Sequence, residues 1–317
     1  MVANRVNLPF TGIRTFGRSP LVTDLDRIDA DIAVYGVPFD LGTQYRSGAR
    51  FGPNGIREGS SLCRLSPHWV YDHEDDEAYF GPDWRIVDCG DADMIHGDVE
   101  TCFENVRKTV RQIVSSGAIP FGMGGDHAVT IPILQALESV GPFTVVQFDA
   151  HLDFVDNVAG QKNGQGSPMR RASELSYVSG LAQLGIRGTG SSSATDFADA
   201  KRYGSLILSA DQIREIGIEE TLGRIPKSQR YYVTIDIDGM DASVAPGTGT
   251  PSPGGFHYPE VRKLLKGISE MGDIIGCDLV EVAPQYDHSE ITVQLAAILM
   301  RDVMAFILKK KERARAA

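Results

Sequence analysis

Carboxylate and imidazole side chains gather at three points of this chain, each shortly after a stretch of apolar residues. Such groups are metal ligands, and four carboxylates with two imidazoles are enough to hold two divalent ions. The candidate ligands are His127 after the apolar stretch at 118–121, Asp149, His151 and Asp153 after 143–147, and Asp236 and Asp238 after 231–235.

An oxygen-rich set of this kind suits Mn²⁺ and also accepts Ni²⁺, Co²⁺ or Fe²⁺, whereas zinc chemistry based on cysteine is not indicated. Two ions close together lower the pKa of water, so a nucleophile exists near neutral pH and the implied chemistry is hydrolysis. Asp149 or Asp236 is the candidate to bridge the ions. Asp153 is the candidate to take the proton of the nucleophile and pass it to the leaving group.

The elements that must position these residues are strands alternating with helices. Short runs of apolar and β-branched residues predict roughly eight strands, and apolar residues at helical spacing predict helices between them. The predicted strands cover 31–37, 85–89, 118–121, 143–147, 181–186, 205–208, 231–235 and 274–279, and the predicted helices cover 98–116, 129–140, 258–270 and 291–310. This alternation predicts an α/β fold of three layers, with a mostly parallel central sheet between two layers of helices.

The fold suggests how the ligands meet. Alternate residues of an extended strand point to the same face, so Asp149, His151 and Asp153 are expected to project together, as are Asp236 and Asp238. Ligands of open α/β sheets bind outside the carboxyl ends of the strands, where all three clusters fall.

Composition excludes several classes of function. The formal net charge of −11 argues against nucleic acid as a partner, because phosphate binding needs a basic face. No segment approaches the roughly 20 apolar residues that a membrane span needs, so no membrane partner is expected. No repeat or linker divides the chain, so residues 1–317 are expected to form one domain. The four cysteines show no close pairing and no signal segment is recognisable, which favours a reducing, cytoplasmic setting.

Five motifs resemble those of the ureohydrolase family, which includes arginase and agmatinase. They are GGDH at 124–127, DAHLD at 149–153, DIDGMD at 236–241 followed by APGTGTP at 245–251, YRSGARFGP at 45–53, and EVAP at 281–284. The segment at 12–18 further resembles the bacterial branch of agmatinase, guanidinobutyrase and guanidinopropionase. The resemblance covers nearly the whole chain and implies an arginase-like fold.

The resemblance also implies roles for individual residues. One metal would be held by His127, Asp149, Asp153 and Asp236, and the other by Asp149, His151, Asp236 and Asp238. Glu281 would pair with a small cationic guanidino substrate, which fits a carboxylate fork. By family the ions are Mn²⁺, with Ni²⁺ as the alternative. The protein would be a homotrimer or homohexamer, and an N-terminal arm at 1–30 would lie near the substrate entrance.

One residue departs from the family pattern. Gln165, in the sequence NGQGSP at 163–168, stands where family members commonly have a histidine. Glutamine cannot titrate, so it can only donate and accept hydrogen bonds. Either Asp153 and water protonate the leaving group while Gln165 orients the substrate, or the substrate is unusual, such as an N-alkylguanidine or a biguanide of the metformin type. A third alternative is a subunit of a hetero-oligomer whose paralogous partner performs catalysis.

The leading hypothesis is therefore a hydrolase with two metal ions that cleaves a C–N bond of a small guanidino compound, such as guanidinobutyrate or agmatine, to urea and an amine. Hydrolysis of a formimino compound on the same metal pair, with release of formamide, is the rival within enzymes.

Overall fold

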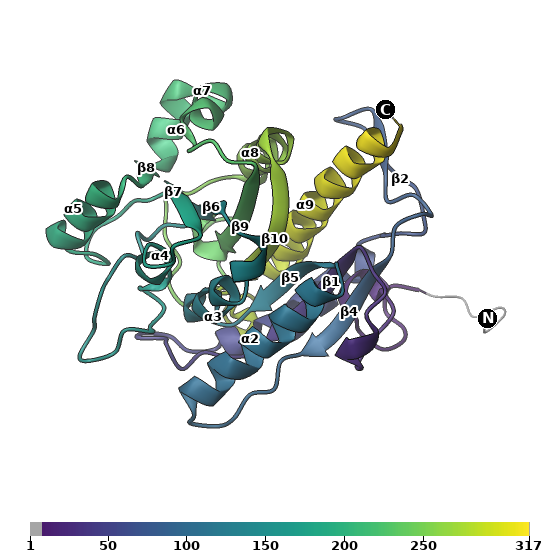
Figure 1. Cartoon of the computed structure of the whole chain (residues 1–317), viewed down its shortest axis with the longest axis horizontal. Coiled ribbons are helices and arrows are strands. Elements are labelled where there is room, and N and C mark those ends of the chain that lie inside the picture. The colour runs from purple at the N-terminus through teal and green to yellow at the C-terminus, as the bar shows by residue number, and fades with distance from the viewer. Residues whose placement is uncertain (1–7, 317) are drawn as a thin grey trace.

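The computed structural model describes residues 8–316 and builds them around one parallel sheet (Figure 1). The sheet has eight strands in the order β4-β1-β5-β10-β9-β6-β7-β8. The strands are β1 (Ile32–Val37), β4 (Ile86–Asp91), β5 (Ile119–Gly124), β6 (Phe143–Phe148), β7 (Val178–Leu184), β8 (Leu206–Leu208), β9 (Arg230–Asp236) and β10 (Asp273–Val280), and a separate hairpin is formed by β2 (Val70–Asp72) and β3 (Glu77–Tyr79). The predicted α/β fold with about eight parallel strands is confirmed.

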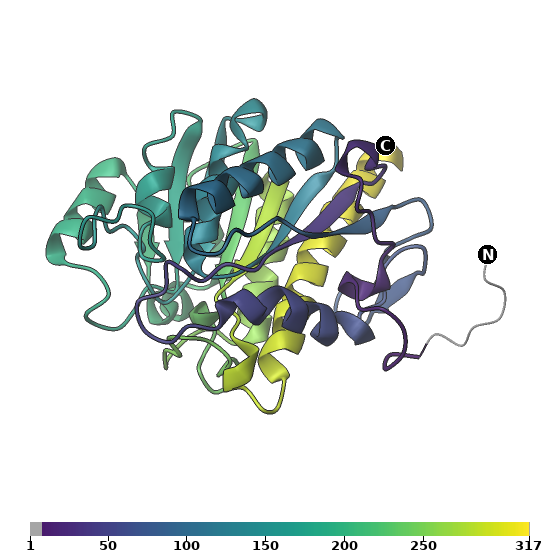
Figure 2. The ribbon, with the colours of Figure 1, turned by 90° about the horizontal axis from the view of Figure 1, so that it is seen from below.

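Helices cover both faces of the sheet, which lies between them in Figure 2. On one face α1, α8 and α9 pack together, and on the other face α2 packs on β5 and on α3. The helices are α1 (Gly52–Gly59), α2 (Val99–Ser115), α3 (Thr130–Gln135), α4 (Pro168–Ala172), α5 (Ala194–Tyr203), α6 (Ala210–Ile216), α7 (Ile218–Arg224), α8 (Tyr258–Met271) and α9 (Ile291–Ala316). The helix predicted at 129–140 is shorter than expected, because α3 ends at Gln135.

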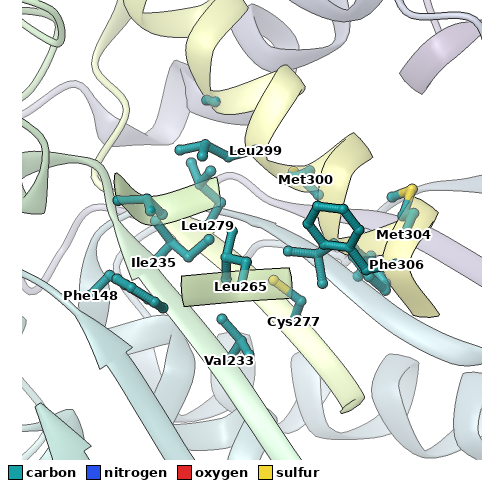
Figure 3. Close-up of a cluster of buried hydrophobic side chains, with 14 of the residues drawn as sticks. Phe148, Val233, Ile235, Leu265, Cys277, Leu279, Leu299, Met300, Met304 and Phe306 are labelled. Carbon is teal, nitrogen blue, oxygen red and sulfur yellow. The ribbon is translucent and has the colours of Figure 1, made fainter. Parts of the chain in front are cut away.

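Successive residues of β1 belong to two separate apolar cores. Val34 lies in the core on the α8 and α9 face, whereas Tyr35 lies in the core on the α2 face. Alternate side chains of a strand point to opposite faces, so a strand covered on both faces must be apolar at nearly every position. Figure 3 shows the first core, which contains Leu279 of β10 and Leu299 of α9. This double burial explains why the strands could be recognised as continuous apolar runs.

Helix α9 corrects one expectation from the sequence. It is long and apolar enough to cross a membrane by length and composition, although no such segment was expected. However, 78% of its most apolar window is buried inside the protein, against the sheet and against α1 and α8. Its apolar character is therefore explained by its place in the core.

The N-terminal arm is joined to β4 by a hydrogen bond to a carboxylate that also belongs to a buried ion pair. The backbone N–H of Phe16 donates to Oδ2 of Asp88 at 2.8 Å. The same carboxylate accepts two hydrogen bonds from the guanidinium of Arg57, at 2.9 and 3.0 Å. The expected contact of the arm with the substrate entrance stays a prediction, and residues 1–7 lie outside the described part of the chain.

The β2–β3 hairpin, which was not predicted, is held to α8 by ionic hydrogen bonds. In its turn, Asp75 accepts from Arg262, Lys266 and Tyr79 at 2.6, 2.6 and 2.7 Å. Burial opposes ionisation of Asp75, but these three donors hold its pKa well below its usual range. Ion pairs therefore hold the turn of the hairpin to α8, while the buried ring of Tyr79 packs against Phe306 of α9, with ring centres 6.2 Å apart.

Candidate metal centre

His127 is positioned by the turn that follows β5. The preceding residue, Asp126, is fully buried and caps the short helix that begins at His127, with its Oδ1 accepting the N–H of Ala128 at 3.0 Å. Its other oxygen accepts the N–H of Gly42 at 2.7 Å. One buried carboxylate thus joins the loop at 41–44 to the turn that carries the histidine.

The imidazole of His127 faces carboxylates that it does not hydrogen-bond. Its Nε2 lies 3.0 Å from Oγ1 of Thr234, which occupies that nitrogen. Its Nδ1 lies 2.8 Å from Asp153, 3.0 Å from Asp149 and 3.5 Å from Asp236, yet this buried nitrogen has hydrogen-bond geometry with none of them. A nitrogen and several oxygens that converge without hydrogen bonds fit a shared divalent cation between them.

Asp149 stands between two groups of ligands. Its Oδ2 faces His127, and its Oδ1 lies 3.5 Å from Nδ1 of His151. The same His151 nitrogen lies 3.1 Å from Oδ2 of Asp238. Two sets of three ligand atoms, each within 4.8 Å of one another, therefore share Asp149: His127, Asp149 and Asp236 form one set, and Asp149, His151 and Asp238 form the other. Each set contains three of the four ligands that the family resemblance implies for one metal position, without Asp153 in the first set and without Asp236 in the second.

The electrostatics of the site call for added positive charge. Burial, followed by repulsion from Asp149, raises the pKa of Asp153 to about 6. Burial and two neighbouring carboxylates likewise raise the pKa of Asp236 well above its usual range. Burial would lower the pKa of His127, but the surrounding carboxylates raise it instead. Two divalent cations would supply the four positive charges that balance Asp149, Asp153, Asp236 and Asp238.

The local backbone differs from the expected extended strands. β6 ends at Phe148, so the stretch from Asp149 to Asp153 is irregular, and Asp238 lies in a short 3₁₀ helix after β9. The expectation that alternation along a strand aligns these ligands was therefore wrong. They converge because the carboxyl ends of β5, β6 and β9 are close together in the parallel sheet.

Two candidate catalytic residues have unusual backbone conformations. Asp153 has φ 51° and Glu281 has φ 64°, in the left-handed region that non-glycine residues seldom adopt. The carbonyl of Asp153 accepts the N–H of Met169 at 3.0 Å, at the start of α4. For Glu281, the N–H donates to the carbonyl of Gly125 at 2.8 Å, and Oε1 accepts the N–H of His127 at 2.8 Å. Such strain clusters at functional sites, where the surrounding structure holds it.

Glu281 is a buried carboxylate that faces the cavity of the site. Burial, followed by the charges of Asp236 and Asp126, raises its pKa well above the usual range. Within residues 8–316, its Oε2 accepts no hydrogen bond, whereas its Oε1 is held by the backbone. A cation in the cavity would therefore meet one free carboxylate oxygen.

A cavity of about 240 Å³ brings most of the predicted residues together. It is lined by Gln44, Tyr45, His151, Asp153, Val155, Val158, Gln165, Gly166, Gly190, Ser191, Asp236, Thr250 and Glu281. All three candidate catalytic residues, Asp153, Gln165 and Glu281, are among them. The remaining candidate ligands, His127, Asp149 and Asp238, are buried behind this wall.

A chain of buried amides that was not predicted from the sequence supports Asp149. Nε2 of Gln147 donates to Oδ2 of Asp149 at 2.6 Å. Oε1 of Gln147 accepts from Gln183 at 2.8 Å, and Oε1 of Gln183 accepts from Ser205 at 2.8 Å. Both glutamines are fully buried. The available signal was a glutamine inside each of two mostly apolar strands. A buried sheet fills such positions with apolar residues unless polar partners are near.

Comparisons with known proteins agree with this geometry. A family model described as the arginase family matches residues 30–306. Guanidinopropionase from Pseudomonas aeruginosa is 35% identical over 310 residues, covering 96% of this chain and 94% of the relative. Agmatinase from Neisseria meningitidis is 35% identical over 291 residues, covering 89% of each chain. The solved structure of proclavaminate amidino hydrolase from Streptomyces clavuligerus has a TM-score of 0.83 at 32% identity, covering 94% of this chain and 98% of that one. The chain therefore belongs to the arginase family.

Proposed function

We propose that this chain is a hydrolase that uses two divalent metal ions to cleave a C–N bond of a guanidino compound, giving urea and an amine. One observation carries the proposal: predicted metal ligands and Glu281 line the same small cavity. The names of relatives support it, since guanidinopropionase and agmatinase both denote guanidino compounds as substrates.

The metal ligands are proposed as two overlapping sets. His127, Asp149, Asp153 and Asp236 would hold one ion, and Asp149, His151, Asp236 and Asp238 the other, with Mn²⁺ as the first candidate and Ni²⁺ as the alternative. When bound, the ions lower the pKa of water enough to supply a nucleophile near neutral pH.

Two side chains of the protein would act on the substrate: Glu281 would bind it, and Asp153 would transfer one proton. The free oxygen of Glu281 would accept N–H groups of the guanidinium, which places the guanidino carbon beside the ligand cluster. Addition of water leaves its oxygen on that carbon as urea. The departing nitrogen takes a proton as the C–N bond breaks, and Asp153 is the proposed donor.

Gln165 would orient the substrate rather than carry a proton. Its backbone N–H lies 3.5 Å from the carbonyl of Gly42, which ties its loop to the loop that Asp126 holds. An amide side chain can accept an N–H of the guanidinium without adding positive charge to the cavity. A neutral contact suits a cationic substrate better than an imidazolium would.

The test is a substrate panel on protein loaded separately with Mn²⁺ and with Ni²⁺. The panel contains agmatine, arginine, guanidino acids, alkylguanidines, metformin and a formimino compound, with urea, formamide and amine as readouts. Urea from a guanidino compound, lost in the isosteric variant Glu281→Gln and in Asp153→Asn, is the expected result. If no compound of the panel yields product with either metal, the proposed function is refuted. Release of formamide in place of urea would favour the formimino alternative.

We also propose a cytoplasmic homotrimer or homohexamer. Light scattering on the purified chain measures the oligomeric state directly. Activity that appears only after a paralogous chain is added would favour the hetero-oligomer instead.

A further inference from the structure

The wall of the active-site cavity falls into a charged part and an uncharged part. Within residues 8–316, the charged and titratable lining residues other than Tyr45 are His151, Asp153, Asp236 and Glu281, all assigned to metal or guanidinium binding. The rest of the wall consists of amide, hydroxyl, phenol, aliphatic and glycine groups, namely Gln44, Tyr45, Val155, Val158, Gln165, Gly166, Gly190, Ser191 and Thr250. The tail of a bound guanidino compound would meet this uncharged part.

The arginine that follows this wall in the sequence is engaged elsewhere. Nε and Nη2 of Arg46 donate to the carbonyls of Gly249 and Thr248, each at 2.9 Å. The guanidinium also lies 4.4 Å from the centre of the Tyr286 ring. Arg46 therefore holds the loop at 247–251 and does not line the cavity.

A second cavity of about 640 Å³ adjoins the first. The two share Gln44 and Val158 as lining residues, so these side chains stand where the cavities meet. The wall of the second cavity contains the carboxylates of Asp98 and Glu100. Asp98 and Glu100 are both exposed, and hydrogen bonds from Thr101 lower the pKa of Asp98.

Among lysines and arginines, the one nearest to this second cavity in sequence is Lys162, and His96 directly precedes the lining residue Gly97. Lys162 lies between lining residues Gln161 and Asn163, but it is exposed, and its charge acts on Asp156. A tail that passes between Gln44 and Val158 would therefore approach two carboxylates, and no lysine or arginine of the described residues lines this cavity.

We propose that this site selects guanidino compounds whose remote end is neutral or cationic and rejects those that end in a carboxylate. The inference rests on the proposed function and narrows it, because it sets agmatine-like compounds apart from guanidinobutyrate. A carboxylate at the end of the tail would lose its bound water on entering the site, and no cation of the wall would compensate for that cost. It would also be repelled by Asp98 and Glu100. Specificity of this kind arises from the cost imposed on the wrong ligand.

The test compares three compounds with the same four-carbon tail: agmatine, 1-butylguanidine and 4-guanidinobutanoate. Their remote ends are cationic, neutral and anionic, so charge is the main difference. Calorimetry on the metal-loaded protein measures the Kd of each compound, and urea release measures kcat/KM. We expect 4-guanidinobutanoate to bind at least about tenfold more weakly than the other two, which corresponds to about 1.4 kcal/mol.

Introducing a positive charge at the junction of the two cavities gives a matched pair of variants. Val158→Lys places an ammonium there, and Val158→Met adds similar length without charge. The lysine variant should bind 4-guanidinobutanoate at least about tenfold more tightly than the methionine variant does. Gln44→Lys repeats the test at the other shared residue.

The outcomes separate this inference from the proposed function. If the predicted order of Kd holds but no compound yields urea, the selectivity stands and the proposed hydrolysis falls. If urea is released but 4-guanidinobutanoate binds as tightly as agmatine, the hydrolysis stands and the selectivity is overturned. Absence of binding by all three compounds overturns the selectivity as well.

Discussion

Replacing Gln147 by leucine should weaken metal binding while leaving the fold intact. Leucine is similar in size, so the buried position stays filled, but Oδ2 of Asp149 loses its 2.6 Å hydrogen bond. The partner Gln183 keeps a bond to the carbonyl of Leu152 at 2.5 Å, so its amide is not left unpaired. The change therefore acts mainly on the carboxylate that both ligand sets share.

The magnitude follows from the kind of bond that is lost. A hydrogen bond to a charged acceptor contributes about 1.5–3 kcal/mol. Loss of a group that orients a metal ligand typically costs about 10–100-fold in metal affinity, which is about 1.4–2.7 kcal/mol. We therefore expect the Kd for Mn²⁺ of Gln147→Leu to rise about 10–100-fold.

Calorimetric titration of the metal-free protein with Mn²⁺ measures this change, and urea denaturation of the same samples checks the fold. Ser205→Ala, two links farther along the amide chain, is the matched control and should have a smaller effect. An unchanged Kd in Gln147→Leu, with binding abolished in Asp149→Ala, would refute the idea that the amide chain positions Asp149.

Three further predictions concern metal loading, stability and pH. Asp238→Asn should lower the metal content from two ions per chain to one, whereas Asp149→Ala should remove both, as elemental analysis would measure. Asp88→Asn removes one of the two carboxylates that pair with the buried guanidinium of Arg57, while Asp91 stays 2.7 Å away, so urea denaturation should give an unfolding free energy lower by about 1.5–3 kcal/mol. Burial opposes the ionisation of Asp75, but its donors lower its pKa, so its contribution is present above the unfolded pKa of about 3.9 and is lost as pH falls below it. Metal-free Asp75→Asn should therefore lose less stability between about pH 5 and 2 than the parent protein, by urea midpoints at each pH.

The sheet could be predicted from the sequence because its strands are buried on both faces. Every residue of β1 and β6 is buried, and such strands appear as continuous apolar runs. The β2–β3 hairpin was missed because its strands are only partly buried and its position depends on ion pairs between Asp75 and α8. Asp75 and Arg262 are 187 positions apart in the sequence, so their ion pair leaves no local sequence pattern from which the hairpin could be predicted.

The candidate site was predictable in its residue types but not in its geometry. The three ligand clusters were recognised from carboxylates and imidazoles at strand ends, yet the backbone from Asp149 to Asp153 is not a strand. The support of Asp149 by Gln147 and Gln183 depends on the pairing of β6 with β7, which sequence spacing does not encode. Likewise, the uncharged wall of the cavity near Gln165 is formed by loops distant in sequence, so it could not be predicted from spacing.

The left-handed conformations of Asp153 and Glu281 have a consequence for the stability of this chain. Each such residue costs about 1–3 kcal/mol relative to a relaxed backbone, so the rest of the fold must carry a surplus of stability to hold both. Glycine at either position would relieve that cost, and selection for thermal robustness alone would favour it. An acidic side chain at each of these positions therefore costs stability, a trade-off between activity and robustness of the kind expected at a functional site.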